Sequence, residues 1–238
     1  MKILALDAAT EACGVALLID EQIFAVSHEG GRHHATEIFS MLDTVLGQAR
    51  VVLGALDCIA VSVGPGAFTG VRASVAIGQG LAFGTPLPVV AVTTLEALAF
   101  AAVREGAVRV LACLDARMGE VYSGAFCRDD RQGVIASRPA IVGPPAAVQA
   151  PPGGAFIGVG RGFAAYPLLC ALPGAAVTAE AQHRLPNAAD MARLAARRFA
   201  AGEAVAADAL MPQYLRDNVA RTLAERLDAQ RDSHGTVI

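Results

Sequence analysis

At 238 residues, the chain is long enough for one large domain or two modest lobes, and it needs no metal or disulfide to hold a core. A net charge of −3 without a basic stripe argues against autonomous nucleic-acid binding. Hydrophobic residues make up 54% of the chain, but no apolar run has the length of a membrane span.

The first residues and the cysteines indicate the compartment. The start, MKILALDAATEA, carries acidic residues where a secretory signal would be apolar. The five cysteines form no C-x-x-C pair and sit mostly within apolar segments, as small core residues do. We therefore expect a cytoplasmic protein in a reducing compartment, with no membrane contact.

A repeated hairpin indicates an internal duplication. LALDAATEACGVALL predicts a strand at residues 3–6, a polar turn and a return strand at 14–18. The later phrase LACLDARMGEVYSGAF has the same pattern, and aligning Asp7 with Asp115 places Leu-Asp-Ala in register. Two halves that open in the same way predict a duplicated lobe, with the boundary near residues 104–108.

Between and after the hairpins, helices and strands alternate, which predicts an α/β fold. Thr93 and Glu96 form a capping-box opening for one helix, and Asn187 with Asp190 caps another. The predicted elements of the first half are an amphipathic helix at 35–46, a strand at 58–63, a helix at 70–84, a strand at 87–92 and a helix from 94 to about 104.

The glycine-rich turn Gly64-Pro65-Gly66 follows a strand that reads as covered on both faces. It has three interpretations: a tight turn, a platform for another protein, or a phosphate cradle at a helix N-terminus. GPGAFTG has neither the P-loop ending nor the dinucleotide spacing. We therefore rank the tight turn first, the protein platform second and the phosphate cradle third. Thr69 is the expected cap of the following helix, with Gly70 as its first residue.

That helix is unusually rich in small residues, with Ala76, Gly80 and Gly84 four positions apart. Each internal glycine costs a helix up to about 1 kcal/mol relative to alanine, so something should pack closely against it. The helix's own sheet and a helix of a second subunit are equally compatible with the sequence.

Candidate catalytic residues do not form a complete set. Asp7 and Thr10 have the arrangement that actin-like ATPases and sugar kinases use for Mg²⁺ and phosphate, but without further motifs a turn-stabilising Asp is the favoured interpretation. At Asp115 the corresponding turn is bulky and charged, so the nucleotide cleft looks degraded. His33 and His34 lack the spacing and the third ligand of a metal site, and no G-x-S-x-G elbow occurs.

Four blocks in order resemble the TsaB (YeaZ) family: LALDAATEACGVAL, GPGAFTGVRASVAIGQGLA, LDARMGEVY and PQYLRDNVA. The resemblance covers nearly the whole chain. It implies a two-lobed actin-like (ASKHA) fold with a duplicated mixed sheet flanked by helices. The expected division is a first lobe at residues 1–106, a second lobe at 107–220 and a polar tail at 221–238.

The resemblance also implies a role without catalysis. Such a chain would be a dimerisation and scaffold subunit that activates the catalytic TsaD subunit, which transfers threonylcarbamoyl to the adenosine beside the anticodon of tRNAs reading A-starting codons. TsaE would join a larger assembly, ATP and a metal would be used by partner subunits only, and tRNA would be bound only through the complex. Alone, the chain would form a homodimer by the same surface.

The helices at 35–46 and 70–84 would carry the partner interface. The expected contact residues are Ile38, Leu42, Gly64, Pro65, Gly66, Phe68, Thr69, Gly70, Arg72, Ala73, Ala76, Ile77, Gly80 and Gly84. The alternative function is an active enzyme of the same superfamily, either a glycoprotease-like peptidase or an ATP-hydrolysing relative of sugar kinases that uses Asp7 and Thr10.

Overall fold

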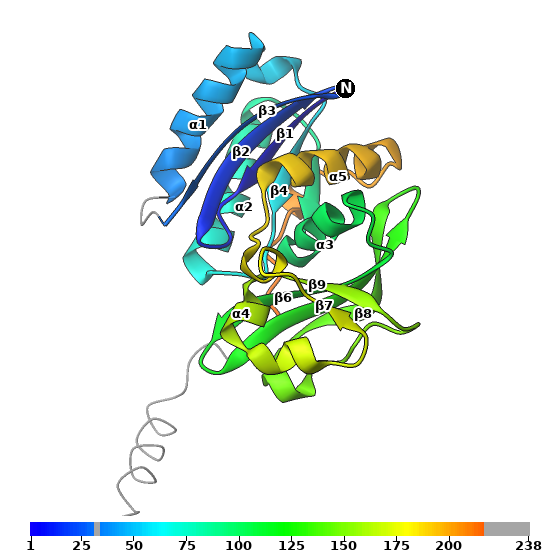
Figure 1. The fold of residues 1–238 in the computed structure, drawn as a ribbon. Helices are drawn as coiled ribbons and strands as arrows, with labels where there is room; N and C mark the ends of the chain where they lie inside the picture. The colour runs from blue at the N-terminus through cyan, green and yellow to red at the C-terminus, as the bar shows by residue number, and fades with distance from the viewer. Residues whose placement is uncertain (31–33, 217–238) are drawn as a thin grey trace, which may run out of the picture.

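The computed structural model describes residues 1–30 and 34–216, which form two five-stranded mixed sheets (Figure 1). The first sheet has the strand order β3-β2-β1-β4-β5, with β1, β2 and β3 antiparallel and β4 and β5 parallel to β1. Its strands are β1 (Lys2–Asp7), β2 (Ala12–Ile19), β3 (Gln22–Glu29), β4 (Cys58–Ser62) and β5 (Val89–Val92).

The second sheet repeats this topology in the order β10-β9-β6-β7-β8, with the same antiparallel and parallel pairs. Asp7 ends β1 and Asp115 lies two residues before the end of β6, and together with the shared topology this confirms the duplication predicted from the repeated hairpin. The strands are β6 (Arg109–Arg117), β7 (Glu120–Asp129), β8 (Gly133–Gly143), β9 (Phe156–Val159) and β10 (Ala175–Ala176).

Helices cover both sheets and fill the space between them (Figure 1). α1 and α2 cover the outer face of the first sheet, and α4 covers that of the second. α3 and α5 lie between the sheets: α3 packs on the second sheet and α5 on the first. The helices are α1 (His34–Ala49), α2 (Phe68–Gly84), α3 (Thr94–Arg104), α4 (Arg161–Ala165) and α5 (Ala188–Ala200).

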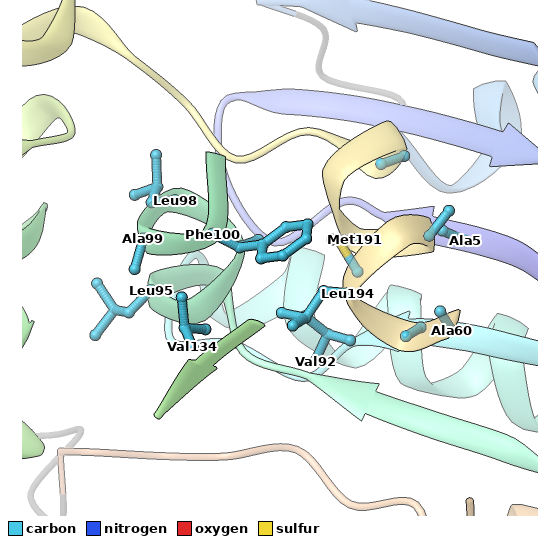
Figure 2. Packing of buried hydrophobic residues seen from close by; sticks show 14 of the residues in the cluster. Ala5, Ala60, Val92, Leu95, Leu98, Ala99, Phe100, Val134, Met191 and Leu194 are labelled. Atoms are coloured by element: carbon cyan, nitrogen blue, oxygen red, sulfur yellow. The ribbon is translucent and has the colours of Figure 1, made fainter. Parts of the chain in front are cut away.

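The largest core is the layer between the sheets. Figure 2 shows Phe100 of α3 directed toward Met191 and Leu194 of α5, with Ala5 and Ala60 of the first sheet on the other side of α5. A second core lies between the first sheet and its outer helices. Because both faces of β4 are covered, all five of its residues are buried, as its uninterrupted apolar sequence predicts.

Helix starts were predictable where a side chain makes the cap. Thr93 and Glu96 form the reciprocal capping box, and the Asp190 N–H donates to Asn187 Oδ1 at 2.8 Å, so both predictions are confirmed. The prediction for α2 is wrong: it begins at Phe68, its cap residue is Ala67, and no side chain accepts a capping hydrogen bond. Thr69 therefore lies inside the first turn.

Residues 203–216 form an extended segment, the C-terminal strap, that ties the two halves together. Val205 pairs with Val89 at the edge of the first sheet, and the Gln213 N–H donates to the Val63 carbonyl at 2.8 Å. At its end, Arg216 donates to Glu120 and to the Ala116 carbonyl in the second sheet's first hairpin. The predicted polar tail at 221–238 lies outside the described residues.

Within residues 1–30 and 34–216, no helix combines the length and the apolar character needed to cross a bilayer.

Candidate functional site

Asp7 stabilises the turn that joins β1 to β2. It is 1% exposed, and its Oδ1 accepts the Ala9 N–H at 3.0 Å. The Ala8 N–H donates to Ser74 of α2 at 2.9 Å, and the Ala12 N–H donates to Thr10 Oγ1 at 3.3 Å. A phosphate would need these backbone donors, and each already has an acceptor within the chain. The geometry therefore favours the turn-stabilising interpretation of Asp7 and Thr10.

A pocket of about 190 Å³ lies beside Asp7, between β2, β3 and the start of α5. Among the residues that the structure describes, its lining includes Asp7, Cys13, His28 and Glu29 but no Lys or Arg. Burial, with a smaller contribution from the Asp7 charge, raises the pKa of the Cys13 thiol to about 12. The thiol therefore stays protonated at neutral pH.

The corresponding turn of the second sheet is occupied by an ion-pair network. Asp115 accepts the Arg117 N–H at 2.8 Å and the Tyr166 hydroxyl at 3.1 Å. The Arg117 guanidinium lies 3.1 Å from Asp115 and donates to Glu11 at 2.9 Å. Because Glu11 belongs to the β1–β2 turn, Arg117 bridges the first hairpins of the two sheets.

The turn at residues 64–66 is a junction where backbones meet closely. A Cβ added to Gly66 would lie 2.0 Å from the Ala9 carbonyl oxygen, and one added to Gly70 would lie 2.0 Å from that of Ala8. The Ala67 N–H also donates to the Ala9 carbonyl at 2.7 Å. These glycines let the turn and α2 pack directly on the β1–β2 turn, which leaves no room there for a phosphate.

The glycines of α2 lie in two different environments. A Cβ on Gly78 would lie 2.4 Å from Val61 Cγ2 of β4, so this glycine permits α2 to approach its own sheet. A Cβ on Gly80 or Gly84 would meet nothing within 4 Å. Packing on its own sheet is therefore confirmed for Gly78. Nothing in the described structure requires Gly80 or Gly84, and packing against a second subunit stays a prediction.

The exposed side of α2 combines these glycines with two aromatic rings and one charge. Phe68 is 44% exposed and Phe83 is 65% exposed. The Arg72 guanidinium lies over the Phe68 ring, 3.8 Å from its centroid, and its Nε donates to the Tyr214 hydroxyl at 2.8 Å. We define the α2 face by its exposed residues Phe68, Thr69, Arg72, Ala76, Gly80, Phe83 and Gly84.

Comparison with known proteins gives the family. The model of "TsaD: tRNA N6-adenosine threonylcarbamoyltransferase" matches residues 17–224. The Escherichia coli tRNA threonylcarbamoyladenosine biosynthesis protein TsaB is 40% identical over 224 residues, covering 92% of this chain and 96% of that protein. The Haemophilus influenzae TsaB is 34% identical, covering 92% and 95%. This chain belongs to the TsaB family.

A solved TsaB-family structure, YeaZ from Pseudomonas aeruginosa, superposes with a TM-score of 0.83 at 40% identity and covers 90% of this chain and 99% of that one. A second structure with the same values is described as similar to the peptidase YEAZ. This likeness, together with the two mixed sheets of identical topology, confirms the two-lobed actin-like (ASKHA) fold.

The structure sorts the contact residues expected from the TsaB resemblance. Phe68, Thr69, Arg72, Ala76, Gly80 and Gly84 are exposed on the α2 face; Gly66, Gly70, Ala73 and Ile77 are half-buried; Gly64 and Pro65 are buried. Ile38 and Leu42 do not belong with them, because both are buried against the first sheet. The amphipathic pattern of α1 had identified its core side. The partner role of the exposed residues stays a prediction.

Three exposed aromatic residues near these helices were missed. Phe39 of α1 and Phe83 of α2 fall outside the apolar periodicity, and Tyr214 lies in the strap, far along the chain from Arg72. The block PQYLRDNVA was a usable signal for Tyr214. It places a Tyr and an Arg in a segment without helical periodicity, where such side chains can make contacts with distant parts of the chain.

Proposed function

We propose that this TsaB-family chain is a non-catalytic scaffold subunit in the cytoplasmic synthesis of threonylcarbamoyladenosine in tRNA. It binds a TsaD-family catalytic subunit through the α2 face and activates it. The observation that carries this proposal is the pair Gly80 and Gly84: Gly80 weakens the helix interior, and a Cβ at either position would meet nothing within the described chain. Small residues of this kind permit close approach of another backbone.

The rest of the α2 face supports the same proposal. Phe68 and Phe83 expose large apolar rings on either side of the small residues, and Arg72 adds a single charge. Aromatic residues and Arg are enriched in the anchors of protein interfaces. The match of the chain to the TsaD model supports a partner of the same fold, because a paralogue would present a corresponding pair of helices.

The Asp7 region supports a role without catalysis. The Asp7 turn uses its backbone donors internally, and the Arg117 bridge holds the opposing hairpin against it. In our proposal the chain binds no cofactor of its own, ATP and metal belong to TsaD and TsaE, and tRNA is met only within their assembly. A homodimer through the α2 face would be the state of the chain alone.

The competing function is an enzyme, and the described similarity of one structural relative to a peptidase is the observation that favours it. Against it, the Cys13 thiol in the pocket beside Asp7 has its pKa raised to about 12 and is a poor nucleophile.

The test is association with the TsaD-family subunit of the same genome, measured by size-exclusion chromatography with light scattering. We expect a 1:1 complex that replaces the homodimer. Gly80→Arg should abolish it without unfolding the chain, because arginine is a better helix former than glycine. Gly143→Arg is the matched control, since a Cβ there also meets open space but lies in the second sheet. Normal association by Gly80→Arg would refute the assignment of the α2 face.

A further inference from the structure

Arg72 is the only charged residue of α2, whose sequence is FTGVRASVAIGQGLAFG. It is exposed, and its stem and head group lie at the Phe68 end of the α2 face. The remaining exposed residues of that face are apolar, small or uncharged. A partner that covers the face must therefore bury or pair one positive charge among otherwise neutral contacts.

The guanidinium is held in a defined position by two residues from different parts of the chain. Its Cζ lies 3.8 Å from the Phe68 ring centroid and 5.8 Å from that of Tyr214. The two rings are 5.9 Å apart, and the Arg72 Nε donates to the Tyr214 hydroxyl at 2.8 Å. A guanidinium stacked on aromatic rings loses less conformational freedom when it binds.

Tyr214 reaches Arg72 because the C-terminal strap is anchored on both sides of it. Upstream, the Gln79 amide of α2 donates to the carbonyls of Ala207 and Leu210 at 3.2 and 2.9 Å. Downstream, Arg216 donates to the Ala116 carbonyl at 3.2 Å and pairs with Glu120. The strap therefore makes the Arg72 end of the face a composite of α2 and the chain's last described residues.

Within the described part of the chain, the terminal nitrogens of Arg72 have no hydrogen-bond partner. Among residues 1–30 and 34–216, the hydrogen bond from Nε is the one that Arg72 makes, and no carboxylate lies within ion-pair distance of it. A planar guanidinium with both Nη groups open fits a carboxylate in the bidentate geometry that lysine cannot provide.

We propose that Arg72 is the specificity-determining residue of the α2 face and that it pairs with a carboxylate of the TsaD-family subunit; this rests on the proposed function. A second copy of this chain fits less well, because α2 carries no Asp or Glu, so its face would bring a second Arg72 of like charge.

The experiment measures the dissociation constant of the heteromeric complex for the full chain carrying Arg72→Glu, with Arg131→Glu as the control of equal charge change. Arg131 is exposed in the β7–β8 turn of the second sheet. We expect Arg72→Glu to weaken binding at least about 30-fold, as for an interface anchor. The salt dependence of binding should also decrease. Changing one Asp or Glu of the TsaD-family subunit to Lys should restore the affinity of that subunit for the Arg72→Glu variant.

Tyr214→Phe tests the positioning of the guanidinium, since it removes the acceptor and keeps the ring. We expect Tyr214→Phe to weaken binding less than Arg72→Glu does. The weakening should appear as a faster dissociation rate.

Three outcomes would overturn the pairing. In the first, Arg72→Glu and Arg131→Glu have the same dissociation constant while Gly80→Arg still blocks association. The α2 face would then be the interface, but Arg72 would not pair with a carboxylate. Arg72→Glu could abolish the homodimer alone, which would assign Arg72 to self-association. If Gly80→Arg itself associates normally, both the proposed function's interface and this inference fail.

Discussion

Gly78 and Gly80 are two residues apart on α2 and lie on opposite sides of the helix. Gly78 is buried against Val61 of β4, while a side chain at Gly80 would meet open space. Gly78 is required by the packing of α2 on its own sheet. Gly80 lowers the stability of the helix, and no contact within the described chain compensates for that loss.

The first prediction separates these two positions by the free energy of unfolding in urea. Gly80→Ala should raise it by about 1 kcal/mol, because alanine is the better helix former. Gly78→Ala should lower it by about 1–3 kcal/mol, because its Cβ would lie 2.4 Å from Val61 Cγ2. Destabilisation by Gly80→Ala would mean that Gly80 has a packing partner within the chain.

The second prediction concerns Asp7, which we assign to the turn and not to chemistry. Asp7→Ala should lower the free energy of unfolding by about 1–3 kcal/mol, because the Ala9 N–H loses a buried acceptor. Asp7→Asn keeps an acceptor oxygen and should cost less. The pure wild-type chain should show no ATP turnover. Turnover that disappears in Asp7→Ala would instead support the enzyme alternative.

The third prediction follows from Cys58, which is buried in β4 and whose pKa burial raises to about 12. In the unfolded chain the thiol ionises near 9.0, so the folded state is favoured below that pH and loses this advantage as the pH rises toward 12. Between pH 8 and 10, wild type should lose roughly 1.4 kcal/mol more stability than Cys58→Ala. Equal losses in urea unfolding would contradict a buried neutral thiol.

The fourth prediction concerns the contact of α3 with α5. Glu96 pairs with Arg198 at 2.7 Å and accepts the Thr93 N–H at 2.9 Å. Burial alone would raise the pKa of Glu96, but the Arg198 charge and these hydrogen bonds lower it below its usual value. Its contribution to stability is therefore present at neutral pH and is lost as the pH falls through that lowered pKa.

Arg198→Met should accordingly cost about 1–3 kcal/mol at neutral pH, because it leaves a half-buried carboxylate without its charged partner. The deficit should narrow at acidic pH, where Glu96 becomes neutral. Glu96→Gln combined with Arg198→Met is the control and should recover part of the loss. A deficit that does not change with pH would show that the variant acts through packing alone.

Local signals predicted most of the fold. The capping residues Thr93 and Asn187 fixed two helix starts because their hydrogen bonds depend on nearby sequence. The Leu-Asp-Ala repeat predicted the duplication, since both hairpins carry it near the end of their first strand. β3 and β8 were missed because both are edge strands with exposed or mixed faces, and Pro139 interrupts β8.

The site was less predictable because it depends on how elements are placed. The sequence around Gly78 and Gly80 is nearly uniform, and the rotation of α2 on its sheet decides which glycine is buried. The same applies to Ile38 and Phe39, whose adjacent side chains face the core and the solvent. Tyr214 meets Arg72 only because the strap returns across the first lobe.

Each half of the chain supplies a helix to the sheet of the other half: α3 packs on the second sheet and α5 on the first. The two halves should therefore not fold independently when the chain is cut between them. Residues 1–106 made alone would carry α3 without the sheet it covers, and the inner face of their own sheet would lack α5. The rest of the chain would have the reciprocal defect. Each fragment would expose an apolar sheet face, so the two should be recovered folded only when they are produced together, as a split protein that reassembles through its central layer.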